Sequence, residues 1–223
     1  MIPSTHLIFY FDLYRLCRVL HGNPRRRLQL RQNGVWLCLT SCLVSLSHKR
    51  LPSMSTTAPL AFSTCDFCDV HKDDTTGAFR VLAPVFLHFG SVPAFSGRVS
   101  TVKCHEDNTL VKAALDSAGE GRVLVVDGGG SLRRALVGGN VAAAAARNGW
   151  AGIVVDGCVR DLAELQVLAV GIRALALIPL PTEKRGEGQR DVPVQIQGVW
   201  VHPGDWLYAD ADGMVVSAKA LSE

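Results

Sequence analysis

The sequence predicts a single α/β domain built on a central mixed sheet, and two patterns carry that prediction. From Ser55 onward, short apolar stretches alternate with helical patterns, as in strand–helix–strand units whose strands pair in parallel. The segment 193–217 is instead rich in strands around two turn signals, Pro203-Gly204 and Asp212-Gly213, which favours antiparallel pairing there. The chain has 223 residues, 48% hydrophobic and 19% charged, which is enough to bury a core without metal or disulfide support.

The first half of the domain is expected to begin with a helix over 63–70. Ser63 or Thr64 is its expected N-cap, and acidic residues follow in its first turn. A second helix is expected over 108–118, where Gly119 ends it. The strands expected in this half are 94–104 and 122–127, and a glycine loop is expected at 128–130.

The second half is expected to continue the alternation. The alanine-rich segment 140–147 predicts a helix, and Asn148-Gly149 is its natural C-terminal stop. The apolar stretch 151–157 predicts a buried strand. The remaining elements are expected as a short helix at 162–168, a strand at 171–177, and β-rich segments at 193–205 and 206–217.

Residues 1–53 differ from the rest of the chain in charge. They carry eight basic residues and one acid, a net charge of +7, so the remaining 15 basic and 19 acidic residues leave the body at −4. An Arg-rich, acid-poor extension is typical of an organelle transit peptide, but a true start at Met54 explains the same pattern. The expected domain is therefore 54–223. It is mitochondrial or in another organelle in the first case and cytoplasmic in the second.

Charge and cysteine usage narrow the class of protein. A mildly acidic body without a basic stripe argues against nucleic acid as the main partner. Seven scattered cysteines predict free thiols in a reducing compartment. Cys65 and Cys68 have C-x-x-C spacing without a second pair, so core packing on a helix is expected. The longest apolar run, 35–46, has 12 residues, whereas a spanning helix needs roughly 20.

Several common active-site patterns are absent from the sequence. The seven histidines form no i, i+4 pair, which argues against a His-rich zinc site. After the glycines 128–130, Arg133 stands where a dinucleotide fingerprint needs its third glycine, and no Gly-Lys-Ser/Thr follows. The sequence also lacks a G-x-S-x-G elbow.

Gly138-Gly139-Asn140-Val141 is the first of two motifs that suggest a binding site. The glycines let a ligand approach the backbone, and the first amides of the following helix are free to bind an anion such as a carboxylate. The alternative is a plain loop in which Asn140 is the N-cap.

The second motif is the hexapeptide Asp156–Asp161, where a buried strand runs into a loop and a helix. The C-terminal edge of parallel strands is where open α/β sheets place ligands. Arg160 suits bidentate binding of a carboxylate, and Asp161 suits a hard cation. The alternative is that Asp161 is a helix N-cap paired with a surface arginine.

The two motifs follow consecutive strands, so their loops are expected to face each other at one end of the sheet. A backbone anion site, an arginine and one carboxylate suit a 2-oxo acid bound through a divalent metal. A cation held by Asp161 would chelate the substrate and stabilise the enolate left when a carbon–carbon bond breaks. Neither motif contains a lysine, which favours this route over a Schiff base.

At these residues the chain resembles the family that contains the regulator of ribonuclease activity A and the class II 4-hydroxy-4-methyl-2-oxoglutarate aldolases. The resemblance extends over about 65–217. Its motifs are Cys68-Asp69, TVKCHEDN (101–108), GRVLVVDGGGSLRRALVGGN (121–140), NGWAGIVVDGCVRD (148–161), KRGEGQRDVPV (184–194) and PGDWLYADADGMVVS (203–217).

The resemblance implies an α/β/β swivelling-type fold and a homotrimer with active sites between subunits. It also implies two catalytic residues: Arg160 grips the substrate, and Asp161 carries Mg²⁺ or Mn²⁺. Aldolase members cleave 4-hydroxy-4-methyl-2-oxoglutarate to two pyruvates and decarboxylate oxaloacetate through the same pyruvate enolate. The implied substrate-binding loop is Gly138, Gly139, Asn140 and Val141.

One position departs from the family pattern. Some aldolase members have an acid where Gly139 stands, and it helps to order the waters of the metal. An acid of another subunit is a candidate replacement, with Glu187 or Asp191 as options. The bacterial inhibitor branch typically lacks the carboxylate at Asp161, so its presence favours catalysis. Two alternatives stay open: a non-catalytic regulator that binds ribonuclease E or an RNA helicase, and a lyase for another oxo acid.

Overall fold

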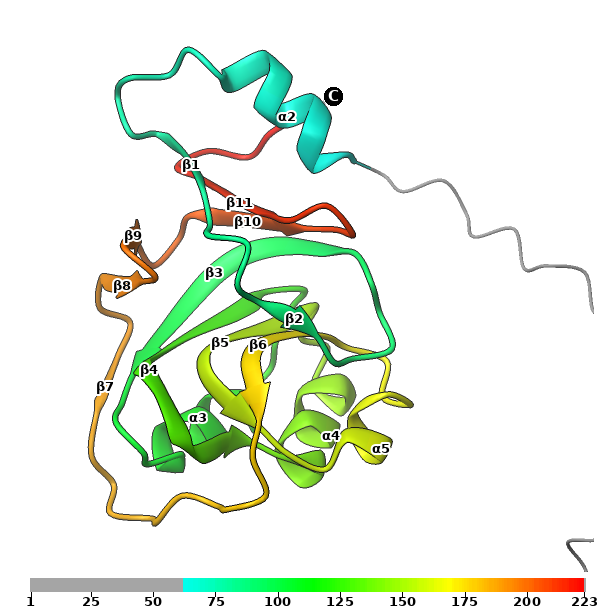
Figure 1. Ribbon diagram of the computed structural model, residues 1–223, viewed down its shortest axis with the longest axis vertical. Helices are drawn as coiled ribbons and strands as arrows, with labels where there is room; N and C mark the ends of the chain where they lie inside the picture. The colour runs from blue at the N-terminus through cyan, green and yellow to red at the C-terminus, as the bar shows by residue number, and fades with distance from the viewer. Residues whose placement is uncertain (1–61, 223) are drawn as a thin grey trace, which may run out of the picture. The chain divides into compact units, whose positions relative to one another are not determined.

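The computed structural model describes residues 62–222, and a central mixed sheet is confirmed (Figure 1). Strands β3, β4, β5 and β6 pair in parallel, in that order. Antiparallel β10, β11 and β1 extend the sheet beyond β3, and β2 pairs antiparallel with β6 at the other edge. The predicted extension, 1–53, and its boundary lie outside the described residues.

The bounds of the elements follow the chain. The helices are α2 (Thr64–His71), α3 (Thr109–Leu115), α4 (Gly139–Arg147) and α5 (Leu162–Leu165). The strands of the first half are β1 (Phe79–Val81), β2 (Leu87–His88), β3 (Phe95–Lys103) and β4 (Val123–Val137). Those of the second half are β5 (Gly152–Val159), β6 (Gly171–Leu177), β7 (Gln189–Arg190), β8 (Val194–Ile196), β9 (Val199–Val201), β10 (Trp206–Ala209) and β11 (Met214–Ser217).

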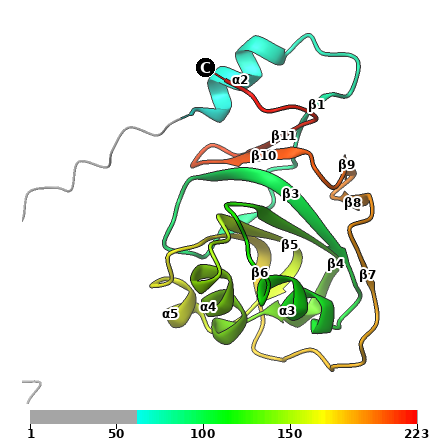
Figure 2. The same cartoon turned by 180° about the vertical axis from the view of Figure 1, so that it is seen from behind.

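The parallel strands form a middle layer that is covered on both faces (Figures 1 and 2). On β4, Leu124 and Val126 pack into the core cluster that includes side chains of α3 and α4. Val123 and Val125 on the same strand pack on the other side, with side chains of β8, β9 and β10. Burial on both faces explains why this strand reads as an unbroken apolar run.

Helix α2 begins where the sequence predicts. Ser63 is the N-cap, and its Oγ accepts a hydrogen bond from the Asp66 amide at 3.2 Å. The predicted core packing of the C-x-x-C pair is wrong for Cys65, which is exposed, because the helix turns Phe67 inward instead. Cys68 is half-buried against the same small cluster. The cysteines of the described part are free thiols, as predicted: Cys65, Cys68, Cys104 and Cys158.

The glycine run at 128–130 stays in the sheet, so the predicted loop is wrong. Strand β4 continues for 15 residues and pairs with β5 through three register shifts. Gly129 and Gly130 have φ of 66° and 67°, which glycine adopts without steric penalty. The strand therefore bulges in place, and its end reaches the end of β5.

Two helices are shorter than predicted. Helix α3 ends at Leu115 and α5 at Leu165, about three residues early in each case. After α3 the chain closes a tighter turn, in which the Ser117 amide donates to the Ala114 carbonyl at 3.0 Å. In the described part of the chain, no helix has the length and apolar character needed to cross a membrane.

Candidate active site

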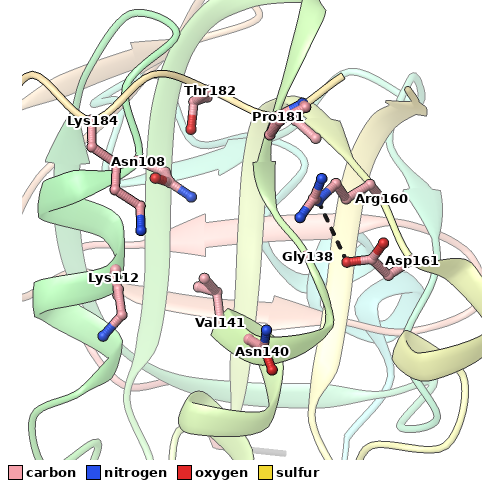
Figure 3. Close-up of a pocket in the computed structure, with 11 residues that line it drawn as sticks. Asn108, Lys112, Gly138, Asn140, Val141, Arg160, Asp161, Pro181, Thr182 and Lys184 are labelled. Carbon is pink, nitrogen blue, oxygen red and sulfur yellow. Dashed lines mark ion pairs between the residues drawn. The ribbon is translucent and has the colours of Figure 1, made fainter. Parts of the chain in front are cut away.

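A cavity of about 210 Å³ opens where β4 and β5 end, at the C-terminal edge of the parallel strands (Figure 3). The two predicted motifs meet here, because Val137 and Val159 are register partners and the chain leaves the sheet after each. Of the six predicted site residues, all except Gly139 line the cavity. The lining residues with polar groups in reach are Asn108, Lys112, Asn140, Arg160, Asp161, Thr182 and Lys184, together with the backbone of Gly138.

The N-terminus of α4 offers fewer free amides than predicted. The helix begins at Gly139 with Gly138 as its N-cap, so Asn140 is not the cap. The Gly139 amide donates to Asp161 Oδ2 at 3.0 Å, and the Val141 amide donates to the Gly138 carbonyl at 3.1 Å. Within residues 62–222 the Asn140 amide has no hydrogen-bond partner. It is therefore the first-turn donor that remains for a bound anion.

Asp161 has a backbone conformation that turns its carboxylate toward α4. Its φ of 63° and ψ of 47° are left-handed, a region in which Asp is enriched among non-glycine residues. Its carbonyl starts α5 by accepting from the amides of Glu164 at 2.9 Å and Leu165 at 3.1 Å. Its side chain does not cap that helix, and it bonds to Gly139 instead. The N-cap alternative thus describes its backbone but leaves its carboxylate for the site.

Arg160 lies beside this carboxylate with its guanidinium partly exposed. Its backbone amide donates to the Val137 carbonyl at 2.9 Å, which ties the end of β5 to the end of β4. Its Nε lies 3.5 Å from Asp161 Oδ2. Its two terminal nitrogens have no hydrogen-bond partner in the described part of the chain. Arg160 can therefore receive a carboxylate in the bidentate manner that guanidinium groups favour.

Both glycines of the loop allow close approach of charged side chains. A Cβ added at Gly138 would lie 2.7 Å from Asp161 Oδ2 and 3.0 Å from Arg160 Nε. A Cβ added at Gly139 would overlap the carboxylate of Glu164 and lie 2.6 Å from its Cδ. A carboxylate from α5 thus occupies the space in which a side chain at position 139 would begin. The sequence analysis missed Glu164, although it follows Asp161 by one helical turn.

Two lysines reach the cavity from elements outside the predicted motifs. Lys112 comes from α3, and Lys184 comes from the segment between β6 and β7 (Figure 3). Lys112 forms an i, i+4 ion pair with Asp116. Together with Arg160, the lysines give three cations against the single carboxylate of Asp161, so the cavity favours anions. The argument against a Schiff base that rested on missing lysines is therefore wrong.

A buried carboxylate holds the segment that carries Lys184. Asp107 is fully buried, and its Oδ2 accepts from the amides of Arg185 at 2.7 Å and Glu187 at 3.1 Å. Its Oδ1 accepts from the Thr109 amide at 2.8 Å. Burial opposes ionisation of Asp107, but these hydrogen bonds outweigh it and hold its pKa well below the usual range. Asp107 thereby joins the start of α3 to the segment after β6.

The other acids singled out in the sequence lie away from the cavity. Within this chain, neither Glu187 nor Asp191 lines it. Asp156, from the same hexapeptide as Arg160, is buried below the β8–β9 turn, where its Oδ1 accepts from Gln197 Nε2 at 2.7 Å. Burial raises the pKa of Asp156. Its side chain therefore belongs to the opposite face of the sheet from the helices.

The donor set fits a hard divalent cation that keeps much of its water. Within residues 62–222, no three His, Cys, Asp or Glu side chains gather as a ready-made metal cage. Zinc sites in proteins use three or four such ligands, whereas Mg²⁺ is often held by one or two carboxylates together with substrate and water. Asp161, with the Glu164 carboxylate over Gly139, corresponds to the second arrangement.

Comparison with known proteins identifies the family. The RraA-like family model, described as Aldolase/RraA, matches residues 64–216. A protein of Albidiferax ferrireducens named "Putative 4-hydroxy-4-methyl-2-oxoglutarate aldolase" is 67% identical over 169 residues, which cover 72% of this chain and 98% of that protein. The matched residues include every segment that lines the cavity.

Solved structures give the same result. The RNA-processing inhibitor RraA from Thermus thermophilis is 45% identical, with a TM-score of 0.68 over 72% of this chain and 95% of that one. A Geobacillus kaustophilus protein described as S-adenosylmethionine: 2-dimethylmenaquinone methyltransferase is 42% identical, with a TM-score of 0.68 over 72% of this chain and 97% of that one. The fold, the cavity motifs and these matches agree, and the chain belongs to the RraA-like family.

Proposed function

We propose that this chain is a lyase that breaks carbon–carbon bonds in small 2-oxo dicarboxylic acids. Its substrates are 4-hydroxy-4-methyl-2-oxoglutarate, cleaved to pyruvate, and oxaloacetate, which is decarboxylated. The observation that carries the proposal is the cavity itself, where Arg160, Lys112, Lys184 and the free Asn140 amide surround the carboxylate of Asp161. Its volume of about 210 Å³ is below the roughly 300–1,000 Å³ of sites for drug-sized ligands, so it suits a small acid.

The substrate is bound by its two charged ends. The unpartnered guanidinium nitrogens of Arg160 take the carboxylate next to the 2-oxo group, and the Asn140 amide adds the positive end of the α4 dipole. The lysines lie across the cavity from Arg160 in Figure 3, so the distal carboxylate is placed between Lys112 and Lys184. The bond that breaks then lies between the two binding points.

Asp161 is the residue that we assign to a divalent cation, Mg²⁺ or Mn²⁺. When bound, that cation supplies positive charge that draws electrons toward the 2-oxo oxygen. The Gly139 amide and Arg160 keep the Asp161 carboxylate in place. Glu164, whose carboxylate lies over Gly139, takes the place of the acid that the family resemblance puts at position 139 and holds water beside Asp161.

The same binding residues serve both reactions. In the cleavage, the hydroxyl group at C4 loses its proton, the C3–C4 bond breaks, and its electron pair passes toward the 2-oxo group. In the decarboxylation, the bond to the distal carboxylate breaks instead, and carbon dioxide leaves. Each reaction produces the enolate of pyruvate, which then takes up a proton at carbon. One cavity that grips the pyruvyl part is therefore sufficient for both.

We further propose that a second subunit completes the cavity in a homotrimer. Three leucines are exposed on β4, on β6 and after β6: Leu132, Leu177 and Leu180, with 54%, 44% and 50% of their surface accessible. The segment after β6 is tied to β4, since the Ala135 amide donates to the Leu180 carbonyl at 2.9 Å. Apolar side chains gathered beside a site are typical of subunit contacts. Light scattering on the full chain is expected to give three times the mass of one subunit.

A second candidate function is supported by the similarity to the RNA-processing inhibitor RraA from Thermus thermophilis. In that case the chain binds and inhibits ribonuclease E or an associated RNA helicase and catalyses no reaction. The convergence of Arg160 and Asp161 on one anion-binding cavity favours the lyase. Inhibition of ribonuclease E that persists in Arg160→Ala, without turnover of either acid, would favour the regulator.

The lyase proposal is tested by turnover with and without metal. The full chain is stripped of metal with a chelator, then given oxaloacetate or 4-hydroxy-4-methyl-2-oxoglutarate, and pyruvate is measured in a coupled assay. We expect Mg²⁺ or Mn²⁺ to restore turnover of both acids and Arg160→Ala to abolish it. If neither acid is turned over with either metal, the proposal is overturned.

A further inference from the structure

Asn108 stands at a capping position without capping. It precedes α3 at the N-cap, where an asparagine side chain ordinarily accepts a hydrogen bond from the helix amides. Here its side chain makes no such bond, and Asp107 accepts from the Thr109 amide instead. The Asn108 side chain is turned toward β4, where its Nδ2 donates to the Leu136 carbonyl at 3.2 Å.

This hydrogen bond distinguishes the two ends of the Asn108 amide. A backbone carbonyl can only accept, so the atom that faces Leu136 is Nδ2 and the other is Oδ1. Oδ1 is buried and has no partner among the described residues. Asn108 is also the residue of this kind that lines the active-site cavity. The buried side-chain atoms without a partner in residues 62–222 are Arg80 Nε, Asn108 Oδ1, Thr109 Oγ1 and Arg173 Nε.

We propose that Asn108 determines specificity by accepting a hydrogen bond from a hydroxyl group of the substrate. An amide oxygen needs a donor, and neither an ionised carboxylate nor a 2-oxo oxygen supplies one. Solvent does not reach Oδ1, so no water satisfies it, and a buried acceptor without a partner is unfavourable. A ligand hydroxyl that enters beside Asn108 removes that penalty. The substrate class is therefore the hydroxylated 2-oxo dicarboxylic acids, in preference to those without a hydroxyl group.

The lysines of the cavity are poor alternatives as the missing donor. Lys112 is paired with Asp116, and no hydrogen bond joins Lys184 to Asn108. In the proposed complex both ammonium groups face the distal carboxylate of the substrate. The inference rests on the proposed function in this respect, because it takes the binding mode from it.

The test compares two substrates in two variants. Asn108→Ala removes the acceptor, and Asn148→Ala is its matched control, because Asn148 Nδ2 likewise donates to a backbone carbonyl, that of Leu115 at 2.8 Å, outside the cavity. We expect Asn108→Ala to lower the ratio of kcat/KM for 4-hydroxy-4-methyl-2-oxoglutarate to kcat/KM for oxaloacetate by roughly tenfold, the worth of one hydrogen bond. The control is expected to keep the wild-type ratio. An unchanged ratio in Asn108→Ala overturns the inference.

A binding measurement separates this inference from the proposed function. Calorimetry on the wild-type chain compares 4-hydroxy-2-oxoglutarate with 2-oxoglutarate, which differ only in the hydroxyl group. The hydroxylated acid is expected to bind roughly tenfold more tightly. If the chain turns over neither acid of the kinetic test, the lyase proposal fails, and this comparison still decides the role of Asn108. Equal affinity for the two acids overturns it, including when Asn108→Ala does not fold.

Discussion

Replacing Gly138 with alanine is expected to remove most of the activity and leave the fold intact. Its φ of −130° and ψ of −177° are extended values that any residue adopts, so alanine adds no backbone strain. The new Cβ would lie 2.7 Å from Asp161 Oδ2, about 0.7 Å closer than the 3.4 Å at which ordinary contact begins. It would also lie 3.0 Å from Arg160 Nε. Both charged groups must move apart, and a misplacement of about 1 Å lowers turnover by up to about 100-fold.

The assay is kcat/KM for oxaloacetate with Mg²⁺, measured beside the thermal midpoint of unfolding. Gly213→Ala is the control, because a Cβ there meets nothing within 4 Å and its φ is not left-handed. We expect kcat/KM of Gly138→Ala to fall roughly 10- to 100-fold. Its Tm is expected to stay within about 4 °C of the control, since a change at an N-cap glycine is worth at most about 1 kcal/mol. Full turnover in Gly138→Ala would refute the assignment of Arg160 and Asp161 to one site.

Three further predictions concern the walls of the cavity. The lowered pKa of Asp107 stabilises the fold above its ordinary value near ~3.9, and this contribution is lost as the pH falls toward the folded pKa. Asp107→Asn should therefore be less stable to urea by roughly 1–3 kcal/mol at pH 7, with a smaller difference below pH ~4, and a constant difference would contradict this. Gly139→Ala and Glu164→Ala should be non-additive in Tm, because the first clashes with the side chain that the second removes; strict additivity would count against that contact. Lys184→Gln should raise KM for oxaloacetate and weaken its salt dependence, and an unchanged KM would exclude Lys184 from binding.

The sequence was sufficient where the signal was local. Ser63 caps α2, and the bounds predicted for the third parallel strand, 171–177, are those of β6. The two site motifs also meet as predicted, because consecutive parallel strands end at the same edge of a sheet. Local rules failed at 128–130, where pairing with β5 keeps the glycines in the sheet through bulges that no short-range pattern reveals.

The rest of the site comes from tertiary packing. Lys112 and Lys184 are 72 positions apart in the chain and meet at the cavity because Asp107 ties their segments together. Glu164 reaches Gly139 only because α5 turns back beside α4. Asn108 resembles an ordinary N-cap in the sequence, and only the bond from its Nδ2 to β4 shows that its amide has another use.

The most direct measurement is the Mg²⁺-dependent turnover of Asp161→Asn. Asparagine adopts the left-handed backbone as readily as aspartate, and its Oδ1 can accept the Gly139 amide, so the variant removes the charge and keeps the geometry. We predict that Mg²⁺-dependent decarboxylation of oxaloacetate falls roughly 100-fold or more, while Tm stays near the wild-type value. Full Mg²⁺-dependent turnover in this variant would contradict the placement of the active site at the ends of β4 and β5.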